Sequence, residues 1–108
     1  MNLFNDIPQD LPEELVTDLL KHKSLRIERI VSQGQSSVKD FWYDQGESEY
    51  LCVLQGEISL EYLDGSKVEL AVADTLLIPA HCKHRVAYTS SEPKCICLAI
   101  FYKGVCDD

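Results

Sequence analysis

The chain lacks any apolar run long enough to cross a lipid bilayer, and its opening residues, MNLFNDIPQDLPEEL, lack the basic and then apolar order of a signal peptide. It is also short of basic residues, because 10 Lys and Arg face 18 Asp and Glu and give a formal net charge of -8. Such a surplus of negative charge repels phosphate backbones and anionic lipid surfaces. We therefore expect a cytoplasmic protein with no nucleic-acid or membrane partner.

A disulfide framework is absent as well. The five cysteines are odd in number, and Cys52, Cys95 and Cys97 lie inside apolar runs, which is typical of reduced, buried thiols. No internal repeat or low-complexity segment divides the chain. With 108 residues and 45% hydrophobic content, it is large enough for a single core, so the sequence predicts one compact domain.

Residues 10–21 carry the signals of a short helix. Pro12 and Glu14 stand where the first turn of a helix favours proline and acidic residues, and Lys21 stands near the expected end. In a helix, one apolar stripe would be formed by Leu15, Val16, Leu19 and Leu20. The sequence therefore predicts an N-terminal arm and short helix over residues 1–24.

Residues 25–108 have a different pattern. Short runs rich in Val, Ile, Leu and Tyr alternate with polar breaks such as SQGQSS, DQGES and TSSEPK. About seven to nine strands at this spacing predict a sandwich or a small barrel. The clearest hairpin lies at Asp64-Gly65, where both residues tolerate the positive φ of a type I′ turn.

The strand EYLCVLQG is apolar on both faces. Alternation places Glu49 on the face of Leu51 and Val53. The opposite face is formed by Tyr50, Cys52 and Leu54. A strand with two apolar faces must be covered on both sides. The core covers one face, and we expect a second subunit of a homodimer or a helix to cover the other.

Two polar residues point toward the predicted core. A carboxylate at Glu49 would be costly among aliphatic side chains unless it is paired, protonated or bound to a cation. In HRVAYT the alternation places His84 with Val86 and Tyr88, so His84 also faces inward. The plainest interpretation of His84 is a buried neutral imidazole that is hydrogen-bonded across the barrel to Glu49 or Tyr88.

The segment GESEYLCVLQGEISLEYLDGSKVELAVADTLLIPAHCKHRVAY resembles the two motifs of the cupin barrel and the linker between them, with the likeness extending over roughly residues 38–102. Glu49 and Gly56 have the spacing that ends the first motif. The second motif is matched at Asp74, Pro79 and His84, while Ala73 and His81 stand at its two glycine positions. Small single-domain cupins are the most similar group, and the resemblance implies an all-β, double-stranded β-helix of the jelly-roll type.

The resemblance also implies a metal site. Cupins bind metal through the glutamate and the second-motif histidine beside an H-x-H pair, and that pair is missing here. Its positions fall on Trp42 and Asp44 or, with a shorter spacing, on Tyr43 and Gln45.

The ligand set implied for one divalent ion is therefore Glu49, His84 and Asp44, with His81 as a weaker candidate that is more simply a solvated turn residue. Oxygen and nitrogen ligands of this kind suit Zn, Mn, Fe or Ni without selecting among them.

The function expected from these residues is the binding of a metal, a small organic molecule or both inside the barrel. The residues expected to line the pocket are Trp42, Tyr43 and Tyr88, although packing explains Trp42 and Tyr43 more simply. Two alternatives stay open. One is a metal-dependent enzyme of the oxygenase or isomerase type, and the other is a non-catalytic interaction or regulatory module.

Overall fold

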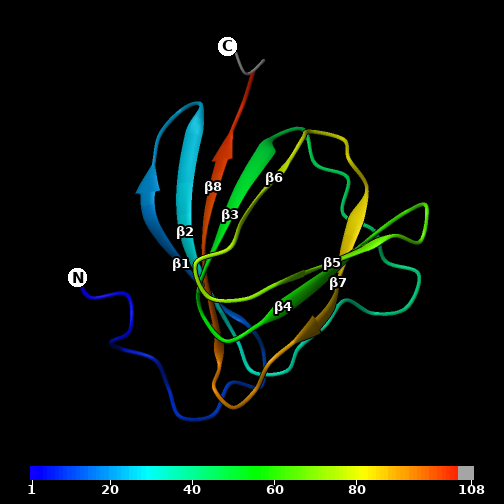
Figure 1. The fold of residues 1–108 in the computed structure, drawn as a ribbon. Coiled ribbons are helices and arrows are strands. Elements are labelled where there is room, and N and C mark those ends of the chain that lie inside the picture. Colours follow the sequence, from blue (N-terminus) through cyan, green and yellow to red (C-terminus); the bar gives the residue numbers. More distant parts are fainter. Residues whose placement is uncertain (105–108) are drawn as a thin grey trace.

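Residues 1–104 are described by the computed structural model, and they form eight antiparallel strands in two sheets (Figure 1). The strands are β1 Leu15–Lys21, β2 Leu25–Ser32, β3 Ser48–Gln55, β4 Ile58–Tyr62, β5 Lys67–Leu70, β6 Thr75–Ile78, β7 His84–Thr89 and β8 Cys95–Tyr102. One sheet has the order β1-β2-β8-β3-β6 and the other has the order β5-β4-β7. The all-β jelly-roll prediction is confirmed, and the strand number falls within the predicted range.

The predicted N-terminal helix is wrong. Residues 15–21 form strand β1, which pairs antiparallel with β2 from Leu15 opposite Val31 to Lys21 opposite Arg26. The local helix signals are worth only fractions of a kcal/mol per residue, so pairing with a neighbouring strand overrides them. A register shift between Asp18 and Leu20 then moves Leu20 to the outer face of the sheet, opposite Ile27.

The hairpin predicted at Asp64-Gly65 joins β4 to β5. Gly65 has a φ of 90° and Asp64 does not take a positive φ, so the predicted type I′ turn does not form. The Asp64 carboxylate instead accepts hydrogen bonds from the backbone nitrogen and the hydroxyl of Ser66, at 2.9 and 2.6 Å. This Asx-type bonding explains how the turn closes without the primed geometry.

The core lies between the two sheets. Alternate residues of β8 point inward and meet the inward residues of β3, β4 and β6. The buried side chains of this cluster are Leu51, Val53, Ile58, Leu60, Leu70, Ile78, Cys95, Cys97, Ala99 and Phe101. Gly56, the last residue of the first cupin motif, lies between β3 and β4 with a φ of 75°, and a Cβ there would overlap Ser90 and the backbone of Lys94. Both observations explain why this position takes glycine.

The outer face of the five-stranded sheet is covered at one end by residues 1–14, which we call the N-terminal arm. Leu11 of the arm packs on Val31 and Ile96, with Leu54 at the edge of this second cluster. The buried Arg29 side chain fixes the arm further, because its guanidinium donates to the carbonyl oxygens of Leu3 and Asn5 at 3.3 and 2.7 Å and to the Thr17 hydroxyl at 3.2 Å.

The other end of this face is uncovered. The pairing register aligns one residue from each strand, and these five form what we call the outer apolar row: Leu20, Ile27, Ile100, Tyr50 and Leu77. Leu20 is 50% exposed, Tyr50 41% and Leu77 45%. The second apolar face of β3 is therefore only partly covered by the chain itself.

Four cysteines lie in residues 1–104, and Cys52, Cys82, Cys95 and Cys97 are all free thiols there, in agreement with the sequence. Cys106 lies outside the described residues. Across the same residues, no helix has the length and apolarity needed to traverse a bilayer.

Candidate functional site

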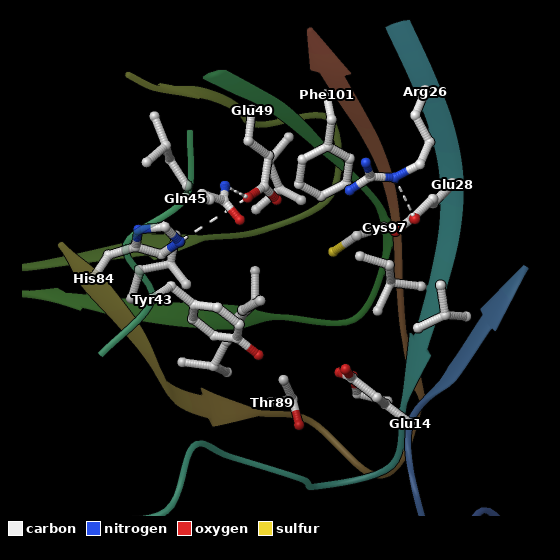
Figure 2. Close-up of a pocket in the computed structure, with 18 residues that line it drawn as sticks. Glu14, Arg26, Glu28, Tyr43, Gln45, Glu49, His84, Thr89, Cys97 and Phe101 are labelled. Carbon is white, nitrogen blue, oxygen red and sulfur yellow. Dashed lines mark hydrogen bonds and ion pairs between the residues drawn. The ribbon is translucent and has the colours of Figure 1, made fainter. Parts of the chain in front are cut away.

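A cavity of about 230 Å³ lies between the two sheets (Figure 2). All strands except β5 contribute to its wall, together with the segment that precedes β3. Most of the wall is aliphatic or aromatic. The polar lining residues are Glu14, Arg26, Glu28, Ser32, Tyr43, Gln45, Glu49, His84 and Thr89. An apolar cavity with a few converging polar groups is the usual form of a small-molecule site.

Glu49 projects into the cavity from β3 and is only 8% exposed. Its Oε1 accepts a hydrogen bond of 3.1 Å from the Gln45 amide. Burial raises the pKa of the Glu49 carboxyl, and this hydrogen bond and the nearby His84 only partly oppose the rise. Glu49 is therefore a carboxyl group whose proton is held more tightly than in water.

His84 faces Glu49 from the first position of β7, and it is 3% exposed. Its Nδ1 lies 2.8 Å from the carbonyl oxygen of Cys82. Because a carbonyl only accepts, Nδ1 carries the proton in this bond, and Nε2 is the ring nitrogen that faces the cavity. Nε2 and Glu49 Oε1 are 4.0 Å apart, which is too far for a direct hydrogen bond.

Tyr43 and Gln45 hold this pair in place. The backbone of Tyr43 forms an isolated bridge with His84, and the two rings are stacked with their centroids 5.4 Å apart. Gln45 bonds Glu49 as described above. Both residues line the cavity, whereas Trp42 and Asp44 do not. Of the two spacings considered for the missing H-x-H pair, the shorter one therefore corresponds to the residues beside Glu49 and His84.

We call Tyr43, Gln45, Glu49 and His84 the His84 cluster. Its groups can accept and donate protons on a molecule placed between the carboxyl and the imidazole. A buried carboxyl with a raised pKa and an oriented imidazole are a common pair for general acid–base catalysis.

A second polar group was not predicted from the sequence. Arg26 donates to Glu28 at 2.7 Å and to both oxygens of Glu47 at 2.9 and 3.1 Å, and its guanidinium lies 4.2 Å above the ring centre of Phe101. These four residues form what we call the Arg26 cluster. The alternation of RIERI, which puts Arg26, Glu28 and Ile30 on one face of β2, was the available signal.

Glu14 was missed for a different reason, since it was assigned to a helix. The residue precedes β1 at the rim of the cavity, and Figure 2 shows its carboxylate pointing inward. Partial burial raises the pKa of Glu14, and the negative charge of Glu28 adds to the rise.

Asp44 and His81 pair with each other outside the cavity. Asp44 Oδ1 lies 2.9 Å from His81 Nδ1, and the two side chains are 43% and 73% exposed. The structure therefore does not bring Asp44 beside Glu49 and His84, where the implied ligand set requires it. His81 has a φ of 61°, and Ala73 has a φ of 73°. Both positions are glycines in the second cupin motif, so left-handed backbone is retained although glycine is not.

Two of the expected pocket aromatics lie elsewhere. Tyr43 lines the cavity, but Trp42 does not, and Tyr88 is 51% exposed. The register of β7 against β4 shifts by one residue between Val86 and Tyr88, which turns Tyr88 outward and Thr89 inward. A β-bulge of this kind reverses the alternation on which the expectation for Tyr88 rested.

Residues 28–101 match the family of the cupin domain, and the chain belongs to this family. Among solved structures it is similar to a "putative mannose-6-phosphate isomerase" from Ralstonia eutropha JMP134, with 38% identity, coverage of 96% of this chain and 97% of that chain, and a TM-score of 0.92. It is also similar to a cupin superfamily protein from Desulfitobacterium hafniense DCB-2, with 21% identity, coverage of 91% and 84%, and a TM-score of 0.76.

A third similar structure is a conserved protein of unknown function from Streptococcus pyogenes, with 16% identity, coverage of 98% and 88%, and a TM-score of 0.76. The second and third structures support the fold alone. Comparison with curated proteins finds no sequence match.

The residues present do not fit the metal centre that many cupins hold. Only Glu49 and His84 remain of its ligands, and Tyr43 and Gln45 occupy the places beside them. Within residues 1–104, no group of three or more His, Cys, Asp or Glu side chains is arranged to hold a metal ion. Two protein ligands are fewer than the three that catalytic zinc sites use.

Proposed function

We propose that the barrel binds a small organic molecule in its cavity, with Glu49 and His84 as the polar groups that recognise it. One observation carries this proposal: the buried His84 Nε2 has no hydrogen-bond partner within residues 1–104 and faces Glu49 Oε1, which Gln45 alone bonds, across 4.0 Å. Buried polar atoms are normally hydrogen-bonded, because an unmet partner costs free energy. A hydroxyl or amino group of a bound molecule between them would bond to both.

The enzymatic form of this proposal is an isomerase. Moving a proton between neighbouring carbons requires a base and an acid on a buried substrate, and Glu49 and His84 are of the right types. The description of the 38% identical Ralstonia protein supports this reaction class.

Isothermal titration with small cyclic alcohols tests the binding proposal. We expect His84→Ala and Glu49→Gln each to weaken affinity at least about tenfold, or roughly 1.4 kcal/mol. His81→Ala is the matched control, because its imidazole is exposed and lies outside the cavity. An equal loss in the control, or no loss in either cavity variant, would contradict the proposal.

A divalent ion held by Glu49 and His84 alone, with fewer protein ligands than the metal centre of other cupins, is the second candidate. It is favoured by the lone pair of His84 Nε2 facing a carboxylate oxygen at 4.0 Å, a separation that two ligands of one ion can have. Zn, Mn, Fe and Ni all accept such a mixed set, with water at the remaining positions. Elemental analysis of untagged protein after titration with each ion is the test. Uptake that both His84→Ala and Glu49→Gln abolish supports the ion, and absence of uptake refutes it.

We also propose that two copies of the chain pair through the outer apolar row. Apolar side chains at register-matched positions of five strands form a continuous stripe on an exposed sheet face. Exposed contiguous apolar surface of this kind commonly marks an interaction site. A pairing face is compatible with the cavity, because the two lie on opposite sides of the same sheet.

A further inference from the structure

The charges that line the cavity are unequal. Three carboxylates, those of Glu14, Glu28 and Glu49, line it, while Arg26 is the only Lys or Arg side chain among the described residues that does so. The whole chain has a formal net charge of -8, so its long-range field has the same sign as the cavity.

Two of the three nitrogens of the Arg26 guanidinium are already paired with carboxylates. Its Nε donates to Glu28, its Nη1 donates to both oxygens of Glu47, and one face of the guanidinium lies against Phe101. A phosphate or carboxylate entering the cavity would have to displace these bidentate and charge-assisted bonds. It would also meet Glu14 and Glu49 without a counter-ion.

The free groups in the cavity are mainly acceptors. Glu14 has no hydrogen-bond or ion-pair partner within residues 1–104, and His84 Nε2 has no hydrogen-bond partner there either. Ser32 is only 5% exposed, lines the cavity, and has a hydroxyl without a hydrogen bond in the described part of the chain. A group that brings several N–H donors and a positive charge would meet these needs together.

The size of the cavity limits the body of the ligand. A volume of about 230 Å³ is below the roughly 300 to 1,000 Å³ that is typical of pockets for drug-sized ligands, so the cavity suits a smaller molecule. The wall between the polar groups is apolar, with Ile30 and Val86 among its residues. A compact hydrocarbon ring or short branched chain matches this space.

We infer that the cavity binds a compact organic ammonium ion, whose charged nitrogen meets the carboxylate of Glu14 at the rim and whose apolar body lies between the sheets. The inference rests on the proposed function of the cavity and adds the chemical class of the ligand. The buried His84 Nε2, which has no hydrogen-bond partner within residues 1–104, is the independent sign that a ligand with a donor completes the site. The same arrangement disfavours anions such as sugar phosphates, which would meet the carboxylates of Glu14 and Glu49 and compete with the ion pairs of Arg26.

Three probes of one shape test the inference: cyclohexylamine, cyclohexanol and cyclohexanecarboxylate, each titrated calorimetrically at neutral pH. We expect the ammonium probe to bind at least about tenfold more tightly than the alcohol, and the carboxylate to bind least. Glu14→Gln should remove most of the preference for the ammonium over the alcohol. The control variant Glu13→Gln, at an exposed neighbour that does not line the cavity, should keep that preference.

The outcomes separate the two proposals. If the alcohol or the carboxylate binds as tightly as the ammonium, the ammonium inference is overturned while binding in the cavity stands. If none of the three probes binds, both are overturned. If the ammonium preference survives in Glu14→Gln, the assignment of Glu14 as its counter-ion is overturned.

Discussion

Tyr43 and His84 contact each other through both their backbones and their rings. The Tyr43 nitrogen donates to the His84 oxygen at 2.7 Å, the His84 nitrogen donates back at 3.2 Å, and the two rings are stacked at an angle of 23°. The bridge ties the segment before β3 to the start of β7. The imidazole is therefore fixed from two directions, by this stack and by the Cys82 carbonyl.

The stack leads to the first prediction. Tyr43→Ala should lower the free energy of unfolding by about 1 to 2 kcal/mol, because it removes both buried area and a ring contact. Tyr43→Phe keeps the ring and should stay within about 0.5 kcal/mol of the parent protein. Urea unfolding of both variants is the measurement. Equal losses would show that the hydroxyl, rather than the ring, holds the segment.

A second prediction concerns the two left-handed residues of the second motif. Ala73→Gly should raise the free energy of unfolding by about 1 kcal/mol, because glycine adopts a φ of 73° without steric strain. His81→Gly should raise it less, since it also loses the exposed pair with Asp44, which is worth about 0 to 1 kcal/mol.

The matched control for these changes is Ala71→Gly, at an exposed alanine that does not take a positive φ. Ala71→Gly should leave the free energy of unfolding unchanged or lower it by up to about 1 kcal/mol, because glycine adds conformational entropy to the unfolded chain. Thermal unfolding of the three variants gives the comparison. A gain in the control equal to the gain at Ala73 would remove the backbone explanation.

The third prediction is a pH dependence of stability at Glu49. A carboxyl whose pKa is raised in the folded protein contributes most to the free energy of unfolding at pH values below its ordinary pKa of 4.5. This contribution to stability is lost as the pH rises through the raised pKa. Glu49→Gln cannot ionise, and its amide oxygen can still accept from Gln45. It should therefore be more stable than the parent at neutral pH, by on the order of 1 kcal/mol.

Urea unfolding across the acidic and neutral range tests this, and the advantage of Glu49→Gln should shrink toward acidic pH. Glu69→Gln, at an exposed position of β5, should show no such trend. A Glu49→Gln variant that is less stable than the parent at neutral pH would mean that the carboxylate is compensated in the folded protein.

The fourth prediction is a homodimer through the outer apolar row. Sedimentation equilibrium should find a dimer at micromolar concentration, and Leu77→Glu should convert it to a monomer by placing a charge in the interface. Leu63→Glu is the control, because Leu63 is 58% exposed in the β4–β5 hairpin and away from the row. A monomeric parent protein would end this proposal.

Within a strand, the sequence predicted well which residues face inward. It predicted poorly the features that depend on pairing with a neighbouring strand. Alternation alone put Glu49 and His84 on the inner face, because residues 48–53 of β3 and the start of β7 are regular. It failed for Tyr88, where a bulge adds one residue to the ladder. A bulge depends on the pairing with the partner strand, so no local pattern in HRVAYT predicts one.

The same limit explains the missed half of the site. Residues 10–21 have good helix signals, and only the pairing of residues 15–21 with β2 decides that this part of the chain is extended. Once residues 10–21 were assigned to a helix, Glu14 could not be placed in the barrel. Tyr43 and Gln45 line the cavity, whereas Trp42 and Asp44 do not. Which of the two pairs faces inward depends on the conformation of a segment with little regular structure.

The hydrogen bonds of Arg29 connect the N-terminal arm to the wall of the cavity. Arg29 holds the carbonyls of Leu3 and Asn5 and, through Thr17, the edge strand that carries Val16 into the cavity wall. Arg29 therefore contacts both the N-terminal arm and the edge strand that lines the cavity. The N-terminal arm and the edge strand of the cavity therefore share one buried side chain, so a label on the first residues is attached to a segment held by the same side chain that supports the cavity wall.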